Sequence, residues 1–131
     1  MNRILQGNSL EVLKTLPAAE FYTCVTSPPY WGLRDYEAGP EEIGTGKEPE
    51  EYIRKLCDIF DQVKIVLKDT GTLWINIDDT YGGSNSRSSK GGRAGLSETV
   101  EREGVFNRGT SRALTAIPEM LVLELIKRGW C

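Results

Sequence analysis

Two consecutive prolines, Pro28 and Pro29, follow an apolar run directly and limit what this part of the chain can form. The run covers residues 21–25 and is rich in aromatic and β-branched side chains, which predicts a short buried strand. Proline fixes its own φ and lacks a backbone N–H, so neither proline can continue a sheet ladder. The residue before each proline is also held extended. The sequence therefore predicts a stiff elbow at the carboxyl end of a strand, where open α/β sheets bind ligands.

The elbow, residues 27–30, carries groups that suit a planar amino group attached to an aromatic ring. Ser27 offers a hydroxyl oxygen, and Pro28 has a carbonyl that no helix or sheet will use. Tyr30 and the next residue, Trp31, offer flat faces on which a ring can stack. Fixed acceptors beside stacking rings predict a pocket for a nucleobase flipped out of a duplex. The alternative is a plain turn, because Ser-Pro and Pro-Pro pairs are frequent in loops.

The tetrapeptide Ser27-Pro28-Pro29-Tyr30 resembles the catalytic motif of the DNA amino-methyltransferases. These enzymes methylate N4 of cytosine or N6 of adenine and take the methyl group from S-adenosylmethionine. Residues 25–36 are similar to the site-specific members, and the order of motifs resembles the circularly permuted class, in which the catalytic half comes first. The resemblance implies that the elbow residues are catalytic, that DNA is the substrate and that S-adenosylmethionine is the cofactor. Serine before Pro-Pro is the commoner pairing with cytosine N4, so cytosine is favoured and adenine stays open.

A helix is predicted over residues 49–67, because a proline suits its first turn and apolar residues recur at helical spacing. A turn at 69–71 and a strand at 72–78 follow, so the segment predicts a parallel βαβ unit. Asp79 lies next, in a stretch similar to a family segment that lies close to the elbow. The resemblance implies that Asp79 lines the substrate site. Its pairing with Asp78 is weak evidence for a metal, because no other ligands accompany it.

The amino-terminal segment predicts a short strand at residues 3–6, then a turn and a helix that Pro17 ends. In the family, a Gly-Asp pair stands at this turn, and its carboxylate accepts a hydrogen bond from the adenine amino group of the cofactor. Here the pair is Gly7-Asn8, so the resemblance implies that these two residues bind the cofactor. An asparagine oxygen can accept the same bond, but without charge assistance. Asn8 is equally suited to a plain helix cap, and both interpretations stay open.

Residues 84–112 contain six Lys or Arg and three Glu in a chain whose net charge is −3. Their Ser- and Gly-rich composition predicts a flexible insertion, which either contacts the DNA backbone or is a solvated surface loop. Arg34, in the polar loop at 32–48, can likewise reach a DNA phosphate or form a surface ion pair, the commoner situation for a single arginine. A last helix is predicted over residues 119–128.

The composition restricts the class of protein. The chain has 131 residues, at most one domain. It has no histidine, and its three cysteines form no Cys-x-x-Cys pair, which argues against a zinc site and against histidine-based catalysis. Free thiols are typical of a reducing cytoplasm, and no apolar run approaches membrane-spanning length. We therefore expect a cytoplasmic protein without a metal and without membrane contact.

The resemblance covers nearly all of the chain apart from the insertion, but only the front part of the family's enzyme. A Phe-x-Gly-x-Gly cofactor loop, the later acidic residue for the cofactor ribose and a target-recognition region are absent from the sequence. The predicted fold class is α/β, a partial Rossmann-like S-adenosylmethionine-dependent methyltransferase sheet with flanking helices. Residues 1–131 are predicted to form its catalytic half, with a basic flexible insertion at about 84–112.

We expect the chain to be a truncated product, a fragment or one half of a split enzyme, and to be inactive alone. Its partners are then DNA and a missing C-terminal half or second subunit. The alternative is a catalytically inactive fragment that acts as a nucleic-acid-binding or subunit-assembly module. Salt-dependent DNA binding without cofactor binding favours that alternative.

Overall fold

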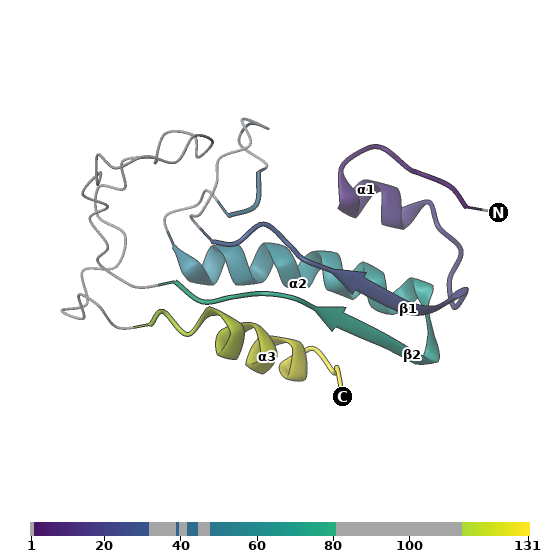
Figure 1. Cartoon of the computed structure of the whole chain (residues 1–131). Helices are drawn as coiled ribbons and strands as arrows, with labels where there is room; N and C mark the ends of the chain where they lie inside the picture. The colour runs from purple at the N-terminus through teal and green to yellow at the C-terminus, as the bar shows by residue number, and fades with distance from the viewer. Residues whose placement is uncertain (1, 32–38, 40–41, 45–47, 81–113) are drawn as a thin grey trace.

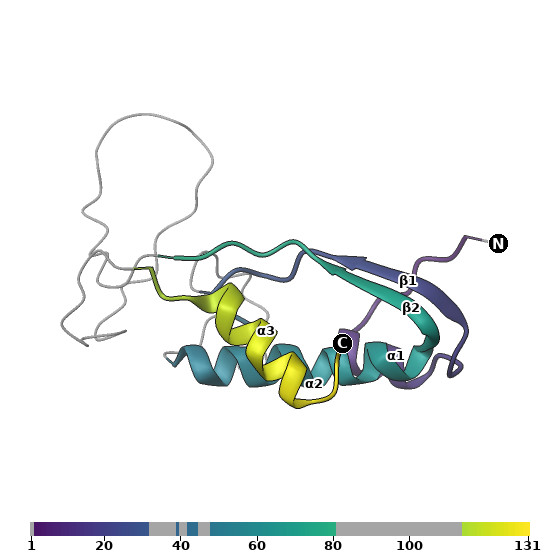
Figure 2. The ribbon, with the colours of Figure 1, turned by 90° about the horizontal axis from the view of Figure 1, so that it is seen from below.

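The computed structural model describes residues 2–31, 39, 42–44, 48–80 and 114–131. In chain order the elements are α1 (Ser9–Lys14), β1 (Phe21–Thr26), α2 (Pro49–Val66), β2 (Leu67–Ile75) and α3 (Ile117–Lys127). The two strands pair in parallel, and α2 and α3 lie on the same side of the sheet (Figure 1, Figure 2). The predicted α/β class and βαβ unit are confirmed. None of the helices in the described part of the chain is long and apolar enough to cross a membrane.

Helix α2 supplies most of the core. Pro49 stands in its first turn, where a missing N–H costs nothing, and Glu50 and Glu51 complement the positive end of the helix dipole. The helix ends at Val66, one residue before the predicted end, because Leu67 is already extended and begins β2. The side chains that α2 buries include Tyr52, Ile53, Leu56, Cys57, Phe60 and Val63.

The ladder between the strands ends where the prolines begin. The strands pair up to Thr26 of β1 and Ile75 of β2, and the N–H of Asn76 adds a bond of 2.9 Å to the Thr26 carbonyl. Pro28 has no N–H and so cannot extend the ladder. Strand β2 therefore ends at Ile75, earlier than predicted.

Strand β2 also begins earlier than predicted, at Leu67, and takes in the turn expected at 69–71. Between the first two pairs of the ladder, β2 advances five residues while β1 advances two, so the turn persists as an irregularity in the strand. A β-carbon at Gly71 would lie 2.8 Å from the carbonyl oxygen of Lys68, closer than real contacts allow. Glycine therefore permits this tight path.

Helix α3 packs on α2 and is held at its carboxyl end by charged groups. It begins two residues before the predicted start. The Arg128 guanidinium donates to Asp58 at 2.8 Å and to Asp61 at 2.7 Å, and these bonds raise the pKa of Arg128 further above its ordinary value. The Lys64 ammonium donates to the Gly129 carbonyl at 2.6 Å. The α3 side chains in the core are Ile117, Leu121 and Leu125.

The predicted strand at residues 3–6 is wrong. These residues form no strand, and Ile4 is fully exposed while Leu5 is 51% exposed. An isolated strand has no ladder to satisfy its backbone groups, and β1 pairs only with β2 among the described residues. The following helix is confirmed as α1, which ends before Pro17.

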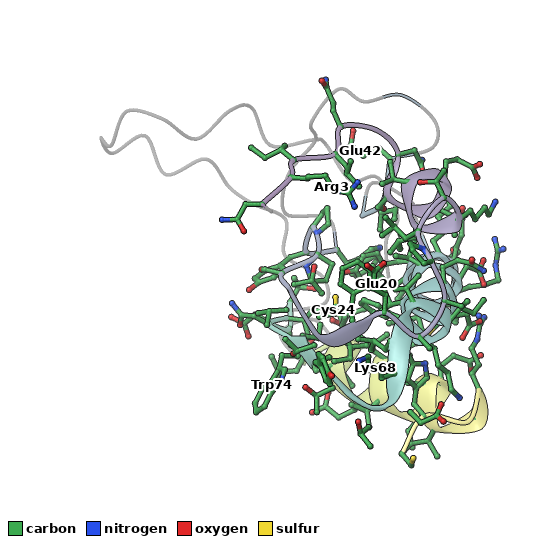
Figure 3. All side chains as sticks on the ribbon, turned by 90° about the vertical axis from the view of Figure 1, so that its right-hand side faces the viewer. Arg3, Glu20, Cys24, Glu42, Lys68 and Trp74 are labelled. Atoms are coloured by element: carbon green, nitrogen blue, oxygen red, sulfur yellow. The ribbon has the colours of Figure 1, made fainter. Side chains whose placement is uncertain are left out.

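One face of the sheet is open to solvent. Val25 and Trp74 pair across the strands and are 76% and 65% exposed. Figure 3 shows the Trp74 side chain pointing away from the helices. On the same face, the Thr72 hydroxyl donates to the Thr23 hydroxyl at 3.1 Å and accepts from the Trp74 indole N–H at 3.2 Å. All-parallel sheets are normally covered on both faces.

Substitutions on opposite faces of α3 test this packing. Leu121→Ala removes a side chain that is 2% exposed and should lower the free energy of unfolding by about 2–5 kcal/mol. Leu123→Ala removes a side chain that is 60% exposed and should change it by about 0.5 kcal/mol or less. Urea unfolding followed by circular dichroism measures both. Equal effects would contradict the assigned orientation of α3.

Candidate active site

The elbow lies directly beyond the carboxyl end of β1, as predicted. Ser27 is exposed, Pro28 is buried, and Pro29 and Tyr30 are half-buried. No group in the described part of the chain hydrogen-bonds the Ser27 hydroxyl or the Pro28 carbonyl. Both acceptors are therefore unengaged among the described residues, and Ser27 is the exposed one of the two.

The backbone of the elbow is held from two directions. The Tyr52 hydroxyl, on the first turn of α2, donates to the Pro29 carbonyl at 2.8 Å. Burial raises the pKa of Tyr52 well above its ordinary value, and the nearby Tyr30 raises it further, so Tyr52 keeps its proton. From a second side, Gly44 packs closely on the elbow: a β-carbon at Gly44 would lie 3.2 Å from the Tyr30 carbonyl oxygen. Gly44 also has a φ of +102°, which favours glycine.

Trp31 lies in the core instead of beside the elbow's exposed groups. Its side chain is 3% exposed and belongs to the same hydrophobic cluster as Tyr52 and Ile117. The expected stacking of Trp31 on a base stays a prediction, and in this structure the ring packs in the core. Tyr30 is then the aromatic residue of the elbow that remains partly accessible.

Asp79 uses both of its carboxylate oxygens within the chain. Oδ1 accepts from the Thr115 hydroxyl at 2.6 Å, the Thr80 N–H at 2.8 Å and the Ile117 N–H at 3.1 Å. Oδ2 accepts from the Ala116 N–H at 2.8 Å. Ala116 precedes α3 with a φ of +60° and offers no side-chain cap, so Asp79 caps that helix from a distant part of the chain.

The surroundings of Asp79 keep it ionised. Burial acts to raise the pKa of this carboxyl, but the bonds from Thr115 and three backbone N–H groups outweigh burial and lower the pKa below its ordinary value. Asp79 follows β2 as the elbow follows β1, so both lie at the same end of the parallel sheet (Figure 1). The expected contact of Asp79 with substrate remains a prediction.

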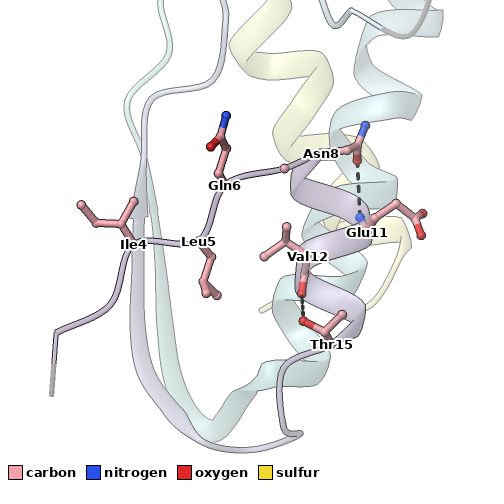
Figure 4. Close-up of a pocket in the computed structure, with 8 residues that line it drawn as sticks. Ile4, Leu5, Gln6, Asn8, Glu11, Val12 and Thr15 are labelled. Atoms are coloured by element: carbon pink, nitrogen blue, oxygen red, sulfur yellow. Dashed lines mark hydrogen bonds between the residues drawn. The ribbon is translucent and has the colours of Figure 1, made fainter.

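Gly7 and Asn8 line a separate, open hollow of about 440 Å³ beside α1 (Figure 4). The Asn8 side-chain oxygen accepts from the N–H groups of Leu10 at 3.0 Å and Glu11 at 3.4 Å, so Asn8 caps α1. Gly7 has a φ of +151°, and a β-carbon there would lie 2.9 Å from a Val12 methyl. The other lining residues are Ile4, Leu5, Gln6, Glu11, Val12 and Thr15, and none belongs to the elbow.

Two predicted features lie outside the described residues: Arg34, and the basic insertion at about 84–112. Within the described residues, no group of three or more Cys, Asp or Glu side chains is placed to hold a metal ion.

A protein-family model described as a DNA methylase matches residues 21–127, a span that contains the elbow, both strands and α3. This chain belongs to the N6/N4 DNA methylase family. The matched span also contains Tyr52 and Asp79, so the residues that position the elbow and α3 lie inside the methylase region. No solved structure was found to match the chain at a significant level.

Several type II methyltransferases are similar to this methylase chain. M.SmaI of Serratia marcescens is 38% identical over 133 residues, which are 98% of this chain and 44% of that relative. M.Cfr9I of Citrobacter freundii is 37% identical over 132 residues, 97% of this chain and 42% of that relative. M.XycI of Xanthomonas campestris pv. cyanopsidis is 38% identical, with the same shares covered as for M.Cfr9I. The chain thus spans less than half the length of these relatives.

Sequence reasoning missed two residues that support the methylase elbow and α3. In the helix predicted over residues 49–67, Tyr52 is one of the residues that recur at helical spacing, and a buried tyrosine hydroxyl usually needs a partner. That requirement was the available signal. Thr115 carries no comparable signal, because its bond to Asp79 joins residues 36 apart in the sequence.

The pH dependence of stability tests the role of Asp79. Aspartate ordinarily has a pKa of about 3.9, and the folded value is lower, so this stabilisation is complete above pH about 4 and is lost below it. Asp79→Asn places an amide donor against backbone donors and should lower the urea midpoint at pH 7. The difference in urea midpoint between Asp79→Asn and the wild type should become smaller below pH about 4.

Asp78→Asn is the matched control. Asp78 accepts one N–H bond, from Asp79 at 2.8 Å, and asparagine keeps that oxygen. This variant should change the midpoint little at either pH. If the urea midpoint of Asp79→Asn differs from that of the wild type by the same amount at every pH, the role of Asp79 as an ionised cap of α3 is contradicted.

Proposed function

We propose that this chain is the catalytic segment of a site-specific DNA methyltransferase that moves a methyl group from S-adenosylmethionine to the exocyclic amino group of a flipped base. The observation that carries the proposal is the Ser-Pro-Pro-Tyr elbow at the carboxyl end of β1, with its two acceptors unengaged within the described chain. Its place in a chain of the DNA methylase family adds support. Cytosine N4 is favoured over adenine N6, because serine stands before the two prolines.

The elbow residues have different roles toward the base. The Ser27 oxygen and the Pro28 carbonyl accept hydrogen bonds from the exocyclic amino group, while the base ring stacks on Tyr30. These bonds draw the nitrogen lone pair out of conjugation with the ring and fix its direction. Bound S-adenosylmethionine supplies an activated methyl group on a positively charged sulfur. Proximity and fixed dipoles then suffice, without a covalent enzyme intermediate.

The hollow beside α1 fits part of the proposed cofactor. Ile4, Leu5 and Val12 give it an apolar wall suited to one face of an adenine ring, and Gly7 leaves space where a side chain would intrude. The Asn8 oxygen already caps α1 with two bonds, and the amide nitrogen is the polar side-chain atom of Asn8 without a bond among the described residues. We propose that Gly7 and Asn8 form one edge of a Rossmann-like cofactor site.

The remainder of the site comes, in this proposal, from residues that this chain does not contain. The type II methyltransferase relatives are more than twice as long as the stretch they share with it. A C-terminal portion or a second subunit would complete the sheet, hold the donor and read the DNA sequence, in the cytoplasm. Arg34 and the basic stretch at about 84–112 would contact the DNA backbone.

Binding of an unpaired base tests the proposal on the chain itself. A short duplex carries pyrrolocytosine, a fluorescent cytosine analogue, opposite an abasic site, and its fluorescence is titrated with protein. Stacking on Tyr30 should quench the fluorescence. Tyr30→Ala should weaken the affinity about 5- to 150-fold, because base–aromatic stacking is worth about 1–3 kcal/mol. Tyr22→Ala is the control, since Tyr22 is 68% exposed near the amino end of β1.

The competing function is a nucleic-acid-binding module without catalysis. That function predicts DNA binding that depends on salt but is the same for wild type and Tyr30→Ala. Such a result, or no binding at all, would count against a base-binding elbow.

Asn8 gives a separate test of the cofactor edge. Asn8→Asp keeps the cap and adds a second acceptor oxygen with a charge, so it should raise the affinity for S-adenosylmethionine measured by calorimetry. Asn8→Ser keeps a cap with a single oxygen and should give no increase. Equal affinities for the two variants would remove Asn8 from the proposed site.

A further inference from the structure

A Pro-Pro elbow lacks the backbone N–H groups that usually hold a chain segment in place by hydrogen bonds. Neither Pro28 nor Pro29 has a backbone N–H, so neither can be tied to β2 by the ladder that holds the rest of β1. Their carbonyls are the backbone groups that remain for attachment. A donor that fixes the elbow at these carbonyls must therefore come from another part of the chain, as a backbone N–H or a side-chain group.

Tyr52 is that donor. Its hydroxyl lies 2.8 Å from the Pro29 carbonyl oxygen, and the two residues are 23 apart in the sequence. The Tyr52 side chain is 2% exposed and stands among buried neighbours on α2, which include Ile53 and Leu56. The hydroxyl is thus presented from a well-packed helix and has little freedom to move.

Along residues 26–31, residues that are held in place alternate with residues whose acceptors or ring are not engaged. Thr26 is held by the Asn76 N–H at 2.9 Å, Pro29 by Tyr52, and Trp31 by burial in the core. Between these points lie Ser27 and Pro28, whose acceptors are unengaged among the described residues, and then Tyr30, which is half-buried.

We propose that Tyr52 is a positioning residue: by holding the Pro29 carbonyl it sets the direction of the Ser27 hydroxyl, the Pro28 carbonyl and the Tyr30 ring. It acts through the elbow and does not touch the base, and the inference rests on the proposed function of that elbow. The raised pKa of Tyr52 supports the assignment, because the phenol then keeps its proton, and stays a donor, above the pH at which an ordinary tyrosine ionises.

Tyr52→Phe tests the proposal, because it removes one oxygen and keeps the ring that fills the core. The first readout is structural: nuclear magnetic resonance of the Pro29 carbonyl carbon and of the backbone N–H groups of Ser27 and Tyr30. These signals should shift and broaden in the variant. The second readout is the affinity for the pyrrolocytosine duplex, which should fall about fivefold, the factor that one net hydrogen bond is worth.

Val63→Ala is the matched control. Val63 lies on the same helix and is 4% exposed, but its side chain has no hydrogen-bonding group with which to hold the elbow. It should lower the stability of the chain while leaving the elbow signals and the base affinity at wild-type values. A loss of affinity that tracks stability in both variants would overturn the positioning role.

The wild-type chain supplies a measurement that needs no variant. The hydroxyl proton of a bonded, buried Tyr52 should exchange with water much more slowly than that of Tyr22, which is 68% exposed. Equal exchange rates, or elbow signals unchanged in Tyr52→Phe, would refute the proposal. If the wild-type chain binds no base, the proposed function fails, and the elbow signals alone then decide whether Tyr52 positions the elbow.

Discussion

The buried face of α2 is the surface on which the rest of this structure depends. Helices α1 and α3 and strand β2 all contact it, and its apolar side chains form the centre of the core. Removing such side chains from water is the dominant favourable term in folding. The same face presents the Tyr52 hydroxyl at one end, and near the other end the helix presents Asp58 and Asp61 to Arg128. One helix thus fixes the elbow and the carboxyl end of α3 together.

Polar contacts at the ends of α3 add to the stabilisation that the core provides. Asp79 gives α3 the amino-terminal cap that Ala116 cannot supply with its own side chain. At the other end of α3, Lys64 donates to the Gly129 carbonyl, just beyond the last turn of that helix. The ends of a helix leave backbone groups unsatisfied, so these contacts remove costs that packing alone would leave. The elbow is the exception in this network, because the acceptors of Ser27 and Pro28 stay unengaged among the described residues. The proposed binding of an amino group at the elbow requires that exception.

The sequence predicted the features that depend on local chemistry. Apolar spacing and proline positions gave α1, the bounds of α2 to within one residue and the parallel pairing. They also gave the place of β1, but the predicted burial of that strand is wrong, because none of its residues is buried. The elbow followed from the prolines themselves. The strand at residues 3–6 failed because a strand needs a partner, which its own residues do not specify. The bond from Tyr52 to Pro29 and the burial of Trp31 depend on contacts between segments far apart in the sequence, so periodicity could not place them.

Asp79 and its neighbours also determine how freely this fold can change in evolution. The Thr115 N–H donates to the Thr80 carbonyl at 2.9 Å, and Asp79 binds the three residues from Thr115 onward. Residues 79–80 are therefore fastened directly to the start of α3. We expect a change in the number of residues between them to leave this fastening in place, because each doubling of a loop's length costs only about 0.6 kcal/mol.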